Sequence, residues 1–212
     1  GMFPDKDSKD LFAEAFSEML SNVDKGFNPK DIEAMWIGNF SNDFFVHQAH
    51  WGPIISDLVG LAPKAITRTE GACASSTLAM RDGVMAIASG MYDIVLVGGV
   101  EEMSKCTTEE VTEGLALATS PYEGAAAYTF PGVFGALATA YFDAYGANRE
   151  HLMNITIKSH NNAPLNPKAQ YGKTIADLIQ AKIARAEKKG QPIPEWADEK
   201  EALFDPRFNP PV

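Results

Sequence analysis

Residues 69–105 read TEGACASSTLAMRDGVMAIASGMYDIVLVGGVEEMSK, and this stretch decides the fold. Apolar residues recur at helical intervals between Leu78 and Met91, which predicts a helix. A nearly continuous apolar run follows at 92–100, and such a run suits a central strand of a parallel sheet that is covered on both faces. The stretch therefore predicts a helix followed by a buried strand, with Cys73 at the point where the preceding strand gives way to the helix.

Helices and strands are predicted to alternate on the N-terminal side of this stretch as well. The spacing of apolar residues predicts helices over 7–20 and 47–61, and strands over 34–37 and 64–72. This order with short connections indicates an α/β fold, a layered, mixed but largely parallel sheet with helices on both faces. Because a βαβ unit normally starts with a strand, we also expect a strand upstream of Met2.

The composition changes beyond about residue 113. Residues 119–134 are typical of a loop, a helix is predicted over 134–145, and a helix after Asn148 leads into a polar, proline-containing loop. Thr174 and Asp177 have capping-box spacing at the start of another predicted helix. Residues 191–212 have no periodicity and end in NPPV. We expect an α/β core over 1–118, and over 119–212 a helix that completes the core followed by an α-rich loop region.

Composition and charge exclude several classes of protein. The 212 residues carry a formal net charge of −10, which argues against nucleic acid and anionic membranes as partners. No secretory signal or membrane-spanning run is found. Two cysteines, Cys73 and Cys106, make neither a disulfide framework nor a metal site, so we expect free thiols, no metal and a cytoplasmic location.

Cys73 is the main candidate for a chemical role. A helix N-terminus stabilises a thiolate through its unpaired amides, and small neighbours leave the sulfur open to a substrate. The neighbours Gly71, Ala72, Ala74 and Ser75 are all small. The alternative is that Cys73 is a small buried residue at a tight junction between helix and sheet.

The same stretch resembles the nucleophile segment of thiolases. In that family a cysteine opens a buried central helix, and a strand that ends in Gly-Gly-Val-Glu-x-Met-Ser follows; here Cys73, SGMYDIVLVGG and VEEMS occur in the same order. The segments DLFAEAFSEML, DIEAMWIGNF and HNNAPLNPKAQYG resemble the branch related to sterol-carrier-protein thiolases, which is acetyl-CoA acetyltransferase-like. The resemblance covers nearly the whole chain and identifies it as similar to the N-terminal half of a thiolase.

The resemblance implies an acyl-CoA acyltransferase of lipid metabolism. Cys73 would take the acyl group as a cysteine acyl-enzyme, in the Claisen condensation or thiolytic cleavage of a 3-ketoacyl-CoA. Coenzyme A thioesters would be substrates, with no permanently bound cofactor. Gly98 and Gly99 either let the chain pass close to the active site or form a plain turn at the end of the strand. Glu101 and Glu102 are interpreted as structural carboxylates that cap or pair.

The groups that the family uses to activate the cysteine are absent. In thiolases the C-terminal half supplies catalytic histidines and a second cysteine, and this sequence stops before that half. Cys106 lacks the context of the second cysteine and is interpreted as a bystander. Four histidines lie outside the family's motifs and are interpreted as surface or core residues: His47, His50, His151 and His160.

By itself the chain is therefore expected to be a poor or inactive thiolase, because a positioned acid or base contributes about 10²–10⁴ in rate. It is either truncated or one half of an enzyme that a separate chain completes. Two alternatives remain open. One is a ketoacyl-synthase-like or hydroxymethylglutaryl-CoA-synthase-like enzyme, and the other is a catalytically silent scaffold or partner subunit of thiolase fold.

The resemblance also implies partners beyond acyl-CoA. Thiolases dimerise through the strand that follows the nucleophile helix, so we expect a homodimer formed around residues 93–104. Coenzyme A is expected in a groove bordered by the region beyond 119. The basic and amide side chains there are spread too thinly to single one out: Lys158, Lys168, Lys173, Lys182, Asn161, Asn162 and Asn166.

Overall fold

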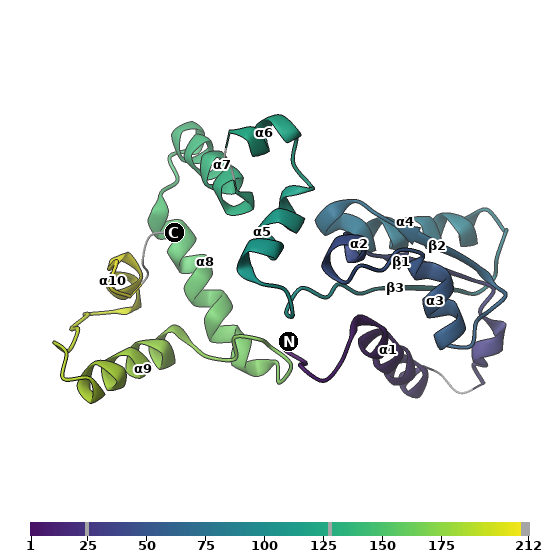
Figure 1. The fold of residues 1–212 in the computed structure, drawn as a ribbon, viewed down its shortest axis with the longest axis horizontal. Coiled ribbons are helices and arrows are strands. Elements are labelled where there is room, and N and C mark those ends of the chain that lie inside the picture. The colour runs from purple at the N-terminus through teal and green to yellow at the C-terminus, as the bar shows by residue number, and fades with distance from the viewer. Residues whose placement is uncertain (24–25, 127–128, 209–212) are drawn as a thin grey trace. The chain divides into compact units, whose positions relative to one another are not determined.

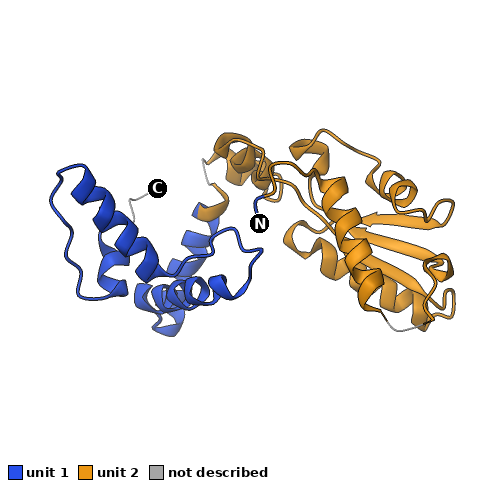
Figure 2. Ribbon diagram, turned by 90° about the horizontal axis from the view of Figure 1, so that it is seen from below, with its two compact units in different colours: residues 1–2, 132–212 blue, residues 3–131 orange. Residues whose placement is uncertain are grey.

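The computed structural model describes residues 1–23, 26–126 and 129–208 (Figure 1). The chain forms two compact units, one of residues 3–131 and the other of residues 1–2 with the chain from 132 onward (Figure 2). The first unit contains the sheet and the second consists of helices. The two units are described separately below.

The first unit is built on a parallel sheet with the order β2-β1-β3. Its strands are β1 (Ala34–Gly38), β2 (Ala65–Thr69) and β3 (Val95–Gly99). Both pairings are parallel, and the register sets Gly38 level with Thr69 on one side and Gly99 on the other. The carboxyl ends of all three described strands therefore meet at one edge of the sheet.

The apolar run at 92–100 was predicted to be a central strand, and this prediction was wrong for the described sheet. It forms the edge strand β3, and β1 is central. The hydrophobic pattern of a strand reports which faces are covered, and it contains no information about how many strands lie beside it. The residues of β1 are mostly buried, whereas those of β3 are half-buried or exposed.

Helices cover both faces of this sheet, as the sequence predicted. Helices α1 (Ser8–Asn22) and α3 (Trp51–Leu58) pack on one face, where Phe12 and Trp51 join Met35 in the main buried cluster. Helix α4 (Ser75–Ala88) packs on the other face, where Val97 lies against Gly83. The fold class is α/β with a parallel three-stranded sheet.

The region predicted as one helix over 47–61 contains a single shorter helix, and another short helix lies just before it. The helix inside the region is α3, α2 (Asn42–Phe45) precedes the region, and the segment between the two helices is not helical. His47 and His50 in this segment have left-handed backbone conformations, with φ of 52° and 59°. A left-handed residue cannot continue a right-handed helix, so the apolar spacing alone overestimated the length of the element. A 3₁₀ turn, η1 (Pro29–Asp31), precedes β1.

Two more helices complete the first unit beyond β3. Helix α5 (Thr108–Ala116) begins with a capping box between Thr107 and Glu110. Helix α6 (Pro121–Ala125) begins with a similar box at Ser120, within a segment that was predicted to be a loop. Five residues are too few for periodicity to reveal α6, although its serine and proline start is a recognisable helix signal.

The second unit consists of helices around a small core. Helix α7 (Phe130–Tyr145) leads into it, and α8 (Arg149–Asn162), the 3₁₀ turn η3 (Ala163–Leu165), α9 (Ile175–Lys188) and α10 (Glu199–Phe204) follow. Met153, Ile175 and Leu203 form its buried cluster. Helix α10 lies where no periodicity was found, and the NPPV end at 209–212 lies outside the described residues.

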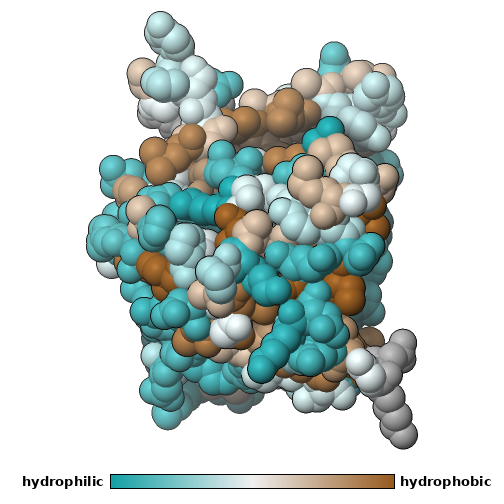
Figure 3. Space-filling model, turned by 90° about the vertical axis from the view of Figure 1, so that its right-hand side faces the viewer, coloured by the Kyte–Doolittle hydropathy of each residue, from teal (hydrophilic) through white to brown (hydrophobic). Residues whose placement is uncertain are grey.

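Large apolar side chains are exposed on the surface of both units. Figure 3 shows one face of the molecule, on which hydrophobic patches lie among hydrophilic residues. Helix α4 exposes Met80, Val84, Met85 and Ile87, and α7 exposes Phe134, Leu137, Tyr141 and Tyr145. No helix in the described part of the chain is long and apolar enough to cross a membrane.

Candidate active site

Cys73 lies at the carboxyl edge of the sheet, in a 3₁₀ turn between β2 and α4. This turn, η2, covers Ala72–Ala74, so α4 itself begins two residues after Cys73. The Cys73 side chain is exposed. Ala74 is the N-cap of α4, and no side chain among the described residues caps the first turn. The Ser75 amide donates to the Ala72 carbonyl, but no described side chain caps the amides that follow it, so the positive end of the α4 dipole lies close to Cys73.

The backbone of the Cys73 turn is sharply bent. Ala72 has a φ of 47°, a left-handed conformation that costs a non-glycine residue about 1–2 kcal/mol. The carboxylate of Glu70 accepts a 2.6 Å hydrogen bond from the Ala72 amide. The bend turns the chain out of β2 and presents the next side chain, that of Cys73, away from the sheet.

The buried side chain of Ser75 forms hydrogen bonds with the backbone of this turn. Its Oγ donates a 2.7 Å hydrogen bond to the Ala72 carbonyl and accepts a 3.1 Å bond from the Gly71 amide. Its own carbonyl accepts a 3.2 Å bond from Thr69 Oγ1, at the end of β2. Ser75 is only 5% exposed, so these bonds replace water for groups that would otherwise be buried without partners.

Two glycines allow α4 to sit directly on the strand ends. A Cβ at Gly38 would lie 2.4 Å from the Ser76 backbone nitrogen, and a Cβ at Gly99 would lie 2.2 Å from Ser76 Oγ. Gly98 faces the opposite side of the sheet, where an added Cβ would lie 2.9 Å from the Phe12 ring. Of the two glycines singled out in the sequence, Gly99 therefore packs against Ser76 and lines the cavity that Cys73 also lines, whereas Gly98 packs against α1.

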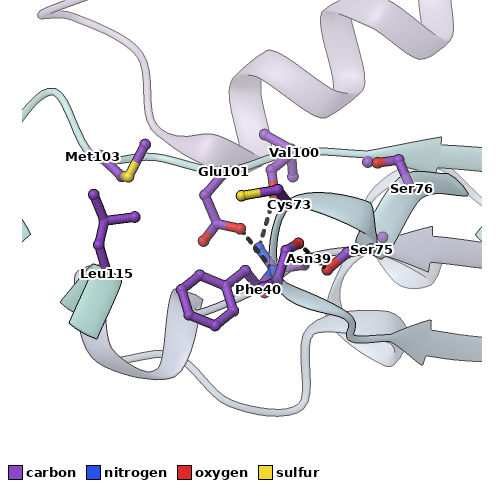
Figure 4. Close-up of a pocket in the computed structure, with 12 residues that line it drawn as sticks. Asn39, Phe40, Cys73, Ser75, Ser76, Val100, Glu101, Met103 and Leu115 are labelled. Atoms are coloured by element: carbon purple, nitrogen blue, oxygen red, sulfur yellow. Dashed lines mark hydrogen bonds between the residues drawn. The ribbon is translucent and has the colours of Figure 1, made fainter. Parts of the chain in front are cut away.

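A cavity of about 350 Å³ opens in front of Cys73. Figure 4 shows the Cys73 side chain directed into this space, with residues from three other segments of the chain around it. The wall includes Asn39 and Phe40 from the loop after β1, Val100, Glu101 and Met103 from the segment after β3, and Leu115 from α5. Asn39, Phe40 and Leu115 were not singled out from the sequence. Asn39 and Phe40 follow the last residue of β1, which is level with the ends of β2 and β3.

Cys106 has different surroundings. Its Sγ donates to the Phe45 carbonyl at 3.4 Å, and it does not line the cavity of Cys73. Burial raises the pKa of the Cys106 thiol, and the nearby carboxylates of Glu110 and Glu102 add to the effect. A thiol with a raised pKa is a weaker nucleophile at neutral pH, which agrees with its interpretation as a bystander.

None of the four histidines lines the cavity of Cys73. Their side chains are exposed or half-buried, and those of α8 bond locally: His151 Nδ1 accepts from the Asn148 amide, and His160 Nδ1 contacts the Lys173 carbonyl at 3.2 Å. No cluster of three potential metal ligands is found in the described residues.

The basic and amide residues considered for coenzyme A all belong to the second unit. Lys182 Nζ donates to the carbonyls of Arg207 and Phe208, both at 2.8 Å. Asn166 Oδ1 accepts from the Lys168 amide within a local turn. The structure does not gather these residues into one site.

The family model for the N-terminal domain of thiolase matches residues 1–201. An acetyl-CoA acetyltransferase of Methanothermobacter thermautotrophicus is 38% identical over 171 residues, covering 76% of this chain and 44% of the relative. A second acetyl-CoA acetyltransferase, of Methanocaldococcus jannaschii, is 39% identical and covers 69% of this chain and 37% of the relative.

A hydroxymethylglutaryl-CoA synthase of Methanococcus vannielii is 29% identical over 130 residues, which cover 61% of this chain and 34% of the relative. The chain thus spans less than half the length of these relatives. The family match covers the sheet, both of its helical layers and the turn that carries Cys73. The chain therefore belongs to the thiolase family and matches its N-terminal domain.

Proposed function

We propose that this chain carries the acyl-accepting cysteine of a thiolase-type acyl-CoA acyltransferase. The observation that carries the proposal is the position of Cys73, an exposed thiol at the mouth of a cavity beside the uncapped first turn of α4. The acetyl-CoA acetyltransferases among the relatives favour a short acyl-CoA as the substrate. Free thiols at Cys73 and Cys106 favour a reducing compartment such as the cytoplasm.

The first step is an exchange of thioesters. The Cys73 thiolate attacks the carbonyl carbon of an acyl-CoA, and the bond between that carbon and the sulfur of coenzyme A breaks. The acyl group becomes a thioester of Cys73, and coenzyme A leaves as a thiolate that takes up a proton. The positive end of the α4 dipole stabilises the attacking thiolate. No oxidant or reductant is needed.

The later condensation or thiolysis step needs groups that the described residues do not place near Cys73. No histidine lines its cavity, and Cys106 bonds to a carbonyl outside it. We therefore propose that this chain works as one half of an enzyme, with the acid and base groups supplied by residues that correspond to the remaining part of its relatives. Adding a C-terminal thiolase half and assaying thiolysis tests this proposal, and recovery of thiolysis would support it.

Intact-mass spectrometry after incubation with acetyl-CoA tests the first step. We expect an acetyl adduct on the wild-type chain and on Cys106→Ala, and none on Cys73→Ala. Peptide mapping should place the adduct on Cys73. A folded wild-type chain that forms no adduct, and whose Cys73 also fails to react with iodoacetamide, would be a silent scaffold, and the proposal would then be wrong.

A hydroxymethylglutaryl-CoA-synthase-like activity is the second candidate, favoured by the synthase among the relatives. Both enzymes start with acylation of the cysteine, so the product distinguishes them. With the C-terminal half present, a thiolase converts acetoacetyl-CoA and coenzyme A into two molecules of acetyl-CoA. A synthase instead combines acetyl-CoA, acetoacetyl-CoA and water into hydroxymethylglutaryl-CoA and coenzyme A.

We also propose a homodimer formed around residues 93–104. Among the described strands, β3 pairs only with β1, so its other edge offers unpaired backbone groups. An apolar cavity of about 510 Å³ between β3 and α4 adjoins it, lined by Met80, Val84, Ile87, Val95 and Val97 among others. This surface is typical of one that another copy covers.

Sedimentation equilibrium tests the dimer. Val84 is 61% exposed on α4, and Leu137 on α7 is 59% exposed, so they form a matched pair. We expect Val84→Glu to weaken association and Leu137→Glu to leave it unchanged. A wild-type chain that remains monomeric at high concentration would contradict the proposal.

A further inference from the structure

The loop after β1 forms one wall of the Cys73 cavity, and a carboxylate from the segment after β3 holds it. Glu101 Oε2 accepts a 2.7 Å hydrogen bond from the Phe40 amide, and Oε1 accepts a 3.1 Å bond from the Ser41 amide. Both oxygens of this half-buried carboxylate therefore bind one short segment of backbone, as the dashed lines in Figure 4 show for Phe40. Bonds of this charge-assisted kind are stronger than those between neutral groups.

Other groups of this loop are also hydrogen-bonded to the segments on either side of it. Asn39 Nδ2 donates a 2.7 Å bond to the Val100 carbonyl. Arg68, at the end of β2, donates to the carbonyls of Asn39 and Phe40 at 3.3 and 2.8 Å. The loop is thus tied to the ends of both strands that flank β1, and Glu101 is the one carboxylate among these ties that also lines the cavity.

The adjacent glutamate, Glu102, has different hydrogen-bond partners. Glu102 is 5% exposed, and its Oε2 accepts a 2.7 Å bond from the Ser8 amide at the start of α1. Its other oxygen pairs with Lys105 at 2.9 Å. Glu102 lines a separate cavity with Trp51 and is absent from the wall around Cys73. Two neighbouring residues of the same type therefore hold different parts of the fold.

We propose that Glu101 is a positioning residue for the acylation of Cys73. By fixing the amides of Phe40 and Ser41 it sets the wall against which the thioester lies, and so orients the carbonyl carbon towards the sulfur. The inference rests on the proposed function, because orientation matters only if Cys73 reacts with a thioester. A displacement of reacting groups by about 1 Å can cost roughly 10²-fold in rate.

The experiment compares two reactions of Cys73 in folded protein. Acetylation by acetyl-CoA requires an oriented substrate, whereas alkylation by iodoacetamide requires only an accessible thiol. We expect Glu101→Ala to slow acetylation about 10–100-fold while alkylation changes less than about threefold. Glu101→Gln retains one acceptor oxygen, so it should restore part of the lost acetylation rate.

Glu102→Ala is the matched control, because it also removes a carboxylate that binds a backbone amide. We expect it to lower the melting temperature and to leave both rates of the folded protein unchanged. Amide hydrogen exchange gives a readout that is independent of catalysis: the Phe40 and Ser41 amides should exchange faster in Glu101→Ala and not in Glu102→Ala.

Three results would overturn the inference. Equal acetylation rates in Glu101→Ala and the wild type would show that the wall does not orient the substrate. A parallel fall in acetylation and alkylation would show that Glu101 supports only the fold around Cys73. A wild-type chain that is alkylated at Cys73 and never acetylated would refute the proposed function, and this inference with it. If Glu101→Ala does not fold, the acetylation and alkylation rates of Glu101→Gln are compared with those of the wild type instead.

Discussion

Cys73 and Cys106 each lie two residues before a helix begins, yet their surroundings differ in every respect that matters for reactivity. Cys73 precedes α4, whose first turn has no side-chain cap, and its thiol is exposed at a cavity. Cys106 precedes α5, where a capping box satisfies the amides of Thr107 and Glu110. Closeness to a helix start therefore does not distinguish the two cysteines, whereas the absence of a side-chain cap and the open cavity beside Cys73 do.

The largest expected effect comes from filling the space that lets α4 reach the strand ends. Gly38→Val would place its side chain on the Ser76 backbone, where a Cβ alone would lie 2.4 Å away. Because backbone cannot move aside as a flexible side chain can, we expect a loss of about 3 kcal/mol in the free energy of unfolding. Urea denaturation measures this.

Gly124→Ala is the control for that substitution, since no atom lies within 4 Å of an added Cβ there. Its free energy of unfolding should change by less than about 1 kcal/mol. A Gly38→Val protein as stable as the wild type would show that α4 does not depend on this close contact.

The next effect concerns the hydrogen bonds inside the Cys73 turn. Ser75→Ala leaves the Gly71 amide without its partner and removes one of the two bonds to the Ala72 carbonyl, which keeps the bond from the Ser75 amide, so we expect a loss of about 2 kcal/mol. Ser89→Ala, at the other end of the same helix, removes one bond to the Ala86 carbonyl at an exposed site and should be nearly neutral. Equal losses in both variants would contradict the role given to Ser75.

The two thiols can be compared directly by timed alkylation with iodoacetamide and peptide mapping. A raised pKa lowers the thiolate fraction of Cys106 at neutral pH, and its thiol is half-buried, so Cys73, which is exposed at a cavity, should react faster at neutral pH. The folded-state pKa of Cys106 is raised above its usual value, so its alkylation should increase only as the pH rises past that value. The neutral Cys106 thiol favours the folded state below the unfolded pKa, and this contribution is lost as pH rises through the folded pKa.

Glu110→Gln provides a second test of the difference between the Cys73 and Cys106 thiols. It removes a negative charge that helps raise the pKa of the Cys106 thiol, so alkylation of Cys106 should shift to lower pH, whereas that of Cys73 stays unchanged. A shift of equal size at both cysteines would indicate a general loosening of the protein.

The smallest effect is expected at Ala72. Glycine adopts a left-handed conformation without the steric cost that alanine has, but it loses more backbone entropy on folding. Ala72→Gly should therefore raise the free energy of unfolding by at most about 1 kcal/mol. A clear loss of stability in the melting curve would mean that the turn is not strained at Ala72.

Much of the fold could be predicted because the signals for it are local. The spacing of Phe12 and Phe16 indicates α1, and Thr174 with Asp177 marks the start of α9. The short helices α2 and α6 were not predicted, because they contain too few residues to show a helical spacing of apolar residues. The helix predicted over 47–61 was too long, because nothing in the apolar spacing reveals that His47 and His50 are left-handed.

The amino-acid sequence by itself determined the α/β class, the thiolase resemblance and the place of Cys73 at the junction of a strand and a helix. Only the tertiary structure decided that β3 lies at the edge of the described sheet, that Gly99 and not Gly98 lines the cavity of Cys73, and that Glu101 binds the Phe40 amide. The physical reason is distance along the chain. Helix periods, caps and turns depend on residues a few positions apart, whereas a cavity wall and its hydrogen bonds join residues about sixty positions apart, which no local pattern encodes.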